Sequence, residues 1–196
     1  MVELLRRWLF PSACVACDAP GPALCAACAP APSAAIRFAV DGVPAFALGP
    51  YDGALRAAVV AMKRGERDHL DTFAALLAQR APPLLGALVP LPTTRGRAAE
   101  RGFDQSAALA RRLAVLHGVP CEEVLVKRGR PQEGRGRRER LGASDRFRLR
   151  GAGLPAAVTL LDDVCTTGAT LRDAIGLLRR AGVGVRRIVV LARTLP

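Results

Sequence analysis

The sequence predicts an α/β fold, a parallel sheet flanked by helices, preceded by a small N-terminal module rich in cysteine. From about residue 46 onward, short apolar segments alternate with longer segments of helical periodicity, the order expected of strands joined by crossover helices. Residues 1–35 instead hold four of the six cysteines and five of the fifteen prolines. A hydrophobic content of 51% over 196 residues is enough for a core. We therefore expect a cysteine module at 1–35 and an α/β domain at 36–196.

The predicted strands are short apolar segments bounded by Gly, Pro or charged residues. They lie at 45–51, 86–91, 122–126, 157–161 and 187–192.

The predicted helices have apolar residues three or four positions apart, which places them on one face. They lie at 54–64, 71–79, 104–116 and 170–181. In the last of these, Leu171, Ile175 and Leu178 align.

A basic segment at 127–150 interrupts this pattern. It holds ten basic and three acidic residues, a local net charge of +7 within a total of +12. Such a charge block does not pack into a core without paired anions. We expect a surface loop or arm that contacts phosphate groups.

The four N-terminal cysteines form two CxxC pairs, Cys14 with Cys17 and Cys25 with Cys28. Two such pairs supply the four thiolates of a closed tetrahedral Zn²⁺ site. Two disulfides and two redox-active pairs are the alternatives, which a reducing compartment and the absence of a strand-to-helix setting disfavour. We predict a structural zinc site. The isolated His69 and His117 are expected at the surface.

The most informative segment is LLDDVCTTGATL at 160–171, an apolar strand that runs into two carboxylates and then a hydroxyl-rich loop opening a helix. Ligands of parallel sheets bind at such strand ends, and a helix N-terminus favours phosphate. The vicinal hydroxyls of a ribose can donate to the carboxylates while its 5-phosphate occupies the loop. The segment lacks the glycine patterns of nucleoside triphosphate and dinucleotide sites, so it favours a sugar phosphate.

This segment resembles the phosphoribosyl pyrophosphate signature of type I phosphoribosyltransferases. Together with the cysteine pairs, VPLP at 89–92 and ERGFDQS at 100–106, the chain resembles the ComF family of competence-associated proteins, also described as amidophosphoribosyltransferase-like. The resemblance spans nearly the whole chain. It implies a type I phosphoribosyltransferase-like sheet behind the zinc module.

The resemblance also implies roles for individual residues. Asp162 and Asp163 would hold the ribose hydroxyls, while Thr166, Thr167, Gly168 and Thr170 would cradle the 5-phosphate. Mg²⁺ would arrive with the ligand. The pyrophosphate or a nucleic acid would contact residues of the turn after the second strand and of the basic segment: Thr93, Thr94, Arg97, Arg101, Lys127, Arg128, Arg137, Arg138 and Arg140.

No catalytic residue is assigned by these patterns. Several purine-using relatives carry a carboxylate where Thr166 stands, whereas other type I enzymes also carry Thr there. Aromatic residues make up 4% of the chain, so no base-binding element stands out.

Three functions follow from the resemblance. The first is a protein that binds phosphoribosyl pyrophosphate and assists uptake of transforming single-stranded DNA. The second is a phosphoribosyltransferase of nucleotide salvage, whose basic segment closes as a catalytic lid. The third is a docking protein whose zinc module holds a competence helicase or an inner-membrane channel component.

No membrane span is predicted, because prolines and cysteines break the poorly charged stretch at 8–36. The first ten residues also lack the apolar run of a signal peptide. We therefore expect a cytoplasmic protein.

Overall fold

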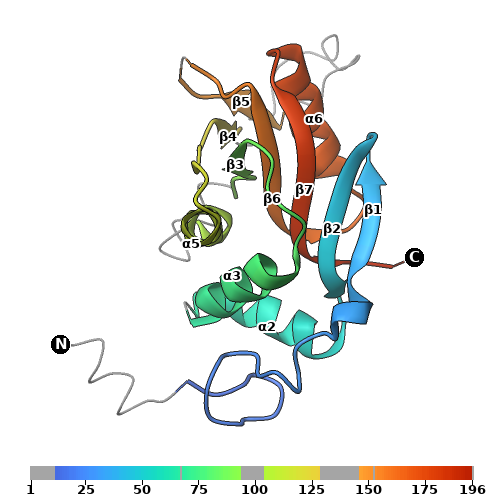
Figure 1. Cartoon of the computed structure of the whole chain (residues 1–196), viewed down its shortest axis with the longest axis vertical. Helices are drawn as coiled ribbons and strands as arrows, with labels where there is room; N and C mark the ends of the chain where they lie inside the picture. The colour runs from blue at the N-terminus through green and yellow to red at the C-terminus, as the bar shows by residue number, and fades with distance from the viewer. Residues whose placement is uncertain (1–11, 67, 94–103, 129–145, 152, 196) are drawn as a thin grey trace, which may run out of the picture.

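A five-stranded sheet in the order β1-β2-β7-β6-β3 dominates the computed structural model (Figure 1). The structure describes residues 12–66, 68–93, 104–128, 146–151 and 153–195. β1 and β2 pair antiparallel, and every other neighbouring pair is parallel. The predicted α/β class is confirmed. The strands are Ile36–Val40 (β1), Val43–Pro50 (β2), Ala87–Pro90 (β3), Ala157–Cys165 (β6) and Gly184–Arg193 (β7).

All four predicted helices are present, with bounds shifted by one to three residues. A 3-10 turn at Pro32–Ala34 (η1) also precedes β1. The helices are Gly53–Lys63 (α2), Asp68–Arg80 (α3), Gln105–His117 (α5) and Ala169–Arg180 (α6).

The strand predictions need three corrections. β1 was not predicted, and neither was β5 (Phe147–Leu149), which lies inside the basic segment. The strand expected at 122–126 is instead β4 (Leu125–Lys127), which pairs with β5 in a separate two-stranded sheet. A strand of three residues is too short to show alternation, and the exposed Glu122 and Glu123 precede the ladder rather than joining it.

The two faces of the sheet are covered by different elements. One apolar cluster joins strand residues such as Phe46 and Val189 to α2, α3 and α5. The other joins residues such as Ala45 and Val190 to α6 and the β4–β5 hairpin. Because both faces are buried, the central strands carry continuous apolar runs rather than alternation. The carboxyl ends of four parallel strands therefore meet at one edge of a three-layer domain.

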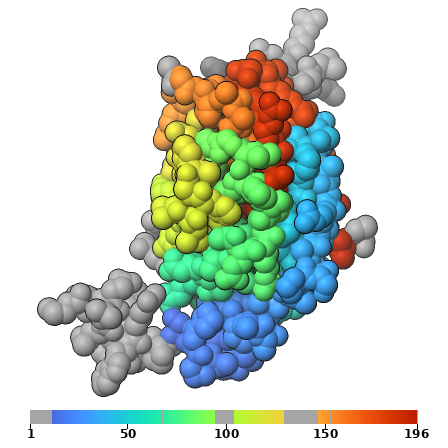
Figure 2. Space-filling model, in the orientation of Figure 1, coloured from blue at the N-terminus to red at the C-terminus, as the bar shows by residue number. Residues whose placement is uncertain are grey.

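The cysteine module packs against the helices of the first cluster. Cys14 and Leu24 are buried in that cluster, and Ser12 Oγ donates to Asp68 Oδ2 at 2.7 Å. Arg80 of α3 donates to the carbonyl oxygen of Pro30. Figure 2 shows the module in direct contact with the surface of the helical layer.

The prediction of a surface position for His69 was wrong. Its side chain is buried in α3, where the ring centroid of Phe73 lies 6.4 Å away. Burial lowers the pKa of His69, so the ring is neutral at physiological pH. A single histidine carries no periodic signal that would have placed it on the buried face.

The turn into β3 is fixed by a side chain of β6. Thr159 Oγ1 accepts from the Leu85 N–H at 2.8 Å and donates to the Leu85 carbonyl oxygen at 3.0 Å. The next residue, Gly86, has φ +72°, and a Cβ there would lie 2.0 Å from the Ala157 carbonyl oxygen. Only glycine fits this approach of two backbones.

Gly86→Ala is therefore expected to destabilise the domain by about 2–4 kcal/mol, because it adds a backbone clash to the cost of a left-handed conformation. Chemical denaturation measures the change. Gly118→Ala is the matched control, since Gly118 is also left-handed but a Cβ there would meet nothing within 4 Å. Equal losses in the two variants would contradict the clash.

Candidate functional site

The predicted ligand residues lie at the carboxyl end of β6, in the middle of the sheet. β6 is paired on both sides, with β7 along its length and with β3 over its first half. Asp162 stands opposite Val190 within the β6–β7 ladder, and Cys165 stands opposite Arg193 at its end. The acidic pair, Asp162 and Asp163, is thus part of a paired strand rather than a loop.

Each carboxylate of the acidic pair uses one oxygen to hold local backbone. Asp162 Oδ1 accepts from the Asp163 N–H at 2.9 Å, and Asp163 Oδ1 accepts from the Val164 N–H at 2.6 Å. Within the described part of the chain, no hydrogen bond reaches Asp162 Oδ2. One oxygen of each carboxylate therefore points away from these local bonds.

The surroundings of Asp162 oppose its ionisation. Burial raises the pKa of Asp162 to about 8, and the charge of Asp163 adds to this, while the positive charges of Lys63 and Lys127 lower it. A perturbed carboxyl group at a strand end is a feature typical of ligand sites.

Sequence reasoning missed Lys63. This residue ends α2, and its Nζ lies 2.8 Å from Asp163 Oδ2, with both side chains about three-quarters buried. The available signal was composition: only Lys63 and Lys127 are lysines in a chain rich in arginine.

The loop after β6 leads directly into α6. Gly168 occupies the N-cap with φ +73° and has no side chain of its own to cap the helix. Thr166 and Thr167 are exposed, and Thr167 Oγ1 accepts from the Ala169 N–H at 3.3 Å. The first turn of α6 thus presents hydroxyl groups and the positive end of the helix dipole.

Two arginines brace this loop. Arg172 Nη1 donates to the Thr167 carbonyl oxygen at 3.0 Å. Arg146, just before β5, has Nε 3.0 Å from Asp173 Oδ2 and donates through Nη1 to Thr170 Oγ1 at 3.4 Å. The end of the basic segment is therefore tied to the first turn of α6.

The turn after β3 borders a separate cavity of about 150 Å³, which Thr93, Asp104, Lys127 and Arg150 help to line. The Thr93 N–H donates to Asp104 Oδ2 at 2.9 Å, and Asp104 also caps α5. Arg128 is exposed at the end of β4. The other expected contacts, Thr94, Arg97, Arg101, Arg137, Arg138 and Arg140, lie outside the described residues.

The four N-terminal cysteines form a separate cluster. Their Sγ atoms all lie within 4.8 Å of one another, and Cys17 Sγ is 3.7 Å from Cys25 Sγ. Tetrahedral thiolates at the Zn–S bond length are about 3.8 Å apart. All four are free cysteines. The cluster can therefore hold a metal ion.

The thiols of this cluster differ widely in pKa. Backbone hydrogen bonds, first from the Cys25 N–H, lower the pKa of Cys14 to about 6. The thiols of Cys17 and Cys25 raise the pKa of Cys28 to about 12. Four thiolates this close need a cation to balance them, which fits the donor set of a zinc site.

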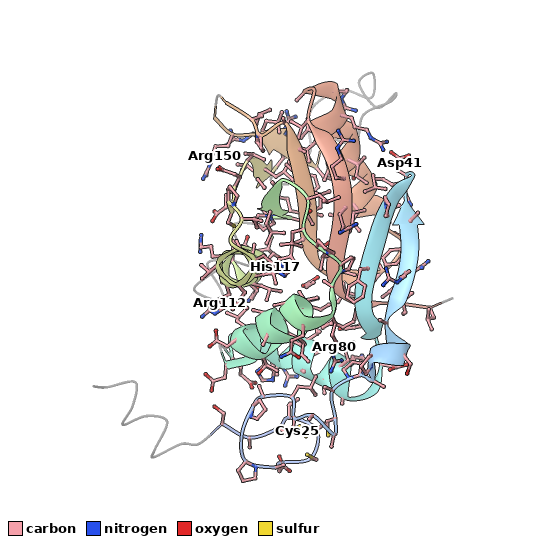
Figure 3. All side chains as sticks on the ribbon, in the orientation of Figure 1. Cys25, Asp41, Arg80, Arg112, His117 and Arg150 are labelled. Carbon is pink, nitrogen blue, oxygen red and sulfur yellow. The ribbon has the colours of Figure 1, made fainter. Side chains whose placement is uncertain are left out.

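The cysteine cluster and the turn between β1 and β2 lie at opposite ends of the molecule. Figure 3 shows Cys25 at the opposite end of the molecule from Asp41, with Arg80 between Cys25 and the strands. None of the helices in the described ranges is long and apolar enough to cross a membrane.

Comparison with known proteins points to one group. No protein-family model matches the chain. The chain is similar to the competence protein ComFC of Streptococcus pneumoniae, with 35% identity over 96 residues, or 48% of this chain and 42% of that protein. It is also similar to competence protein F of Haemophilus influenzae, with 32% identity over 114 residues, or 55% of this chain and 50% of that protein.

The chain thus spans half or less of the length of these two curated relatives. Both relatives are named as competence proteins, and their identity with the chain over about half of its length agrees with its resemblance to the ComF family.

Proposed function

We propose that the chain binds phosphoribosyl pyrophosphate at the carboxyl end of β6 and assists the uptake of single-stranded DNA in competence. The observation that carries the ligand assignment is the acidic pair, held in the β6–β7 ladder directly before the loop that opens α6. The competence role rests on the names of the two relatives.

The geometry of the acidic pair suits a vicinal diol. Asp162 Oδ2 and Asp163 Oδ2 are the oxygens left over from the local backbone bonds. A ribose can donate one hydroxyl to each carboxylate, and charge-assisted hydrogen bonds of this kind are among the stronger ones in proteins. Binding through neutral donors also avoids placing an anion against two carboxylates.

The loop suits the 5-phosphate. Thr166, Thr167 and Thr170 offer hydroxyl groups, and the left-handed Gly168 at the N-cap has no side chain to cap the first turn of α6. Backbone N–H groups at such a helix N-terminus bind phosphate oxygens. Mg²⁺ belongs to this proposal as the ion carried by the pyrophosphate of the ligand, since Mg²⁺ is commonly held by substrate phosphates and water.

The DNA part of the proposal rests on positive charge. Arg128 and Arg148 are both exposed, and strand alternation places them on one face of the β4–β5 hairpin. Arginine pairs well with phosphate groups through its planar fork. Among the described residues, the hairpin therefore presents at least two positive charges on one face.

The cysteine cluster is proposed as a structural zinc site. A module this small buries too little apolar surface to fold alone, so metal binding supplies much of its folding free energy. Its buried Cys14 then connects the metal to the core beneath α3.

Calorimetric titration of phosphoribosyl pyrophosphate with Mg²⁺ tests the ligand proposal. The wild type is expected to bind, and Asp162→Asn/Asp163→Asn is expected to lose about 100-fold or more in affinity, because Asp163 loses its charge and each side chain exchanges an acceptor oxygen for an amide donor. Asp173→Asn, a carboxylate on α6 facing Arg146, is the control that should bind far more tightly than the double variant. Absence of binding to a folded wild type would reject the proposal.

The salt dependence of binding to a single-stranded oligonucleotide tests the DNA proposal. Arg128→Gln/Arg148→Gln should lower the slope of log affinity against log salt by about 1.4, since each phosphate contact on single strands contributes about 0.7. The exposed pair Arg37→Gln/Arg186→Gln, on β1 and β7, should leave the slope unchanged. Absence of DNA binding even at low salt would reject the DNA proposal and favour the alternative in which the basic segment closes over the ligand as the lid of a phosphoribosyltransferase.

Metal analysis tests the zinc site. Protein purified without added zinc should contain about one equivalent, and Cys17→Ser/Cys28→Ser should abolish it and lower the melting temperature, because the metal supplies folding free energy. Cys121→Ser lies outside the cluster and should retain the metal. Far less than one equivalent in the wild type would contradict the assignment.

A further inference from the structure

Both lysines of the chain act on the acidic pair, Lys63 by direct contact and Lys127 through its charge. Lys63 ends α2 and pairs with Asp163 at 2.8 Å, and the charge of Lys127, at the end of β4, is also felt by Asp162. Every other basic residue of the chain, apart from the two histidines, is an arginine. Lysine carries a compact charge on a flexible stem with three N–H donors, so it can contact a carboxylate and a phosphate at once.

The path of α2 explains how Lys63 reaches the site. α2 starts three residues after β2 ends, so it begins at the carboxyl edge of the sheet. Its eleven residues span about 16 Å. β2 and β6 are two positions apart in the sheet, or about 10 Å. The helix is therefore long enough to carry its last residue from β2 across β7 to β6.

The backbone of Lys63 is fixed, whereas its side chain has donors to spare. Its carbonyl oxygen accepts from Gln105 Nε2 at 3.5 Å, which ties the end of α2 to the start of α5. In the described residues, Asp163 is the one acidic partner of Lys63 Nζ. Two of the three ammonium N–H donors remain for a ligand.

Charge balance gives Lys63 a role beyond fixing Asp163. Two carboxylates at the end of one strand would repel a pyrophosphate, and two lysines offset that charge. The ribose of the ligand sets the distance: its pyrophosphate is attached at C1, next to the 2-hydroxyl. With the 2-hydroxyl on Asp163, the ammonium of Lys63 lies beside the C1 substituent, while the 5-phosphate is held at the other end of the sugar.

We propose that Lys63 is a pyrophosphate-binding residue, which bridges Asp163 and the phosphate attached at C1 of the ligand. This inference rests on the proposed sugar-phosphate site and adds to it the residue that recognises the pyrophosphate. A purely structural Lys63 would hold Asp163 in place for any ribose phosphate. A pyrophosphate-binding Lys63 distinguishes ligands that carry the C1 phosphate from ligands that lack it.

The experiment compares two probes on the full chain: phosphoribosyl pyrophosphate with Mg²⁺, and ribose 5-phosphate. Lys63→Met should weaken binding of the first by about 10- to 100-fold, the loss expected of a charged hydrogen bond. Its effect on ribose 5-phosphate should be several-fold smaller. Lys63→Arg keeps the charge and should recover part of the lost affinity.

Arg64→Met is the matched control, since it removes the same charge from the next, exposed residue. It should leave the ratio of the two affinities unchanged. Melting temperature and metal content verify that each variant is folded.

The possible outcomes separate the two proposals. If Lys63→Met weakens both probes equally, or neither, the pyrophosphate role is rejected and the sugar-phosphate site stands. If the folded wild type binds neither probe, the sugar-phosphate site itself is rejected, and the role of Lys63 is rejected with it.

Discussion

The parallel pairing of β6 with β7 is the constraint on which the rest of the molecule depends. This ladder runs from Ala157 to Cys165 and from Gly184 to Arg193, through the centre of both apolar clusters. It continues past Leu161 into the acidic pair and ends at Cys165. Two carboxyl groups are thereby held side by side in a strand that has little freedom to separate them, and this opposes the ionisation of Asp162.

The pairing of β6 with β7 also explains the electrostatics of the acidic pair at the carboxyl end of β6. The backbone N–H groups of Asp163 and Val164 and the ammonium of Lys63 share the charge of the pair, and Asp162 still has a raised pKa. Local instability of this kind is typical of ligand sites, where binding rather than folding satisfies the side chains. The adjoining loop and the N-terminus of α6, by contrast, favour a negatively charged group such as a phosphate.

The cysteine module and the domain share one packed cluster. Cys14 and Leu24 lie in it, and Arg80 and Asp68 of α3 bond the chain on either side of the cysteines. A metal bound by the cysteines would therefore stabilise a module that packs on the same helical layer as α2. The module is far from the β4–β5 hairpin in the fold, so the basic surface and the metal cluster are separate features.

The sequence by itself determined the features that depend on residues close together in the chain, namely the helices, the cysteine pairs and the strand-to-loop segment. Helical periodicity placed α2, α3, α5 and α6, the CxxC spacing identified a cysteine cluster that can hold a metal ion, and LLDDVCTTGATL located the candidate ligand site at one strand end. Only the tertiary structure brought Lys63 to Asp163, turned Ile36–Val40 into an antiparallel edge strand, and buried His69. These features depend on sheet order and helix packing between residues far apart in the chain, which no local pattern encodes.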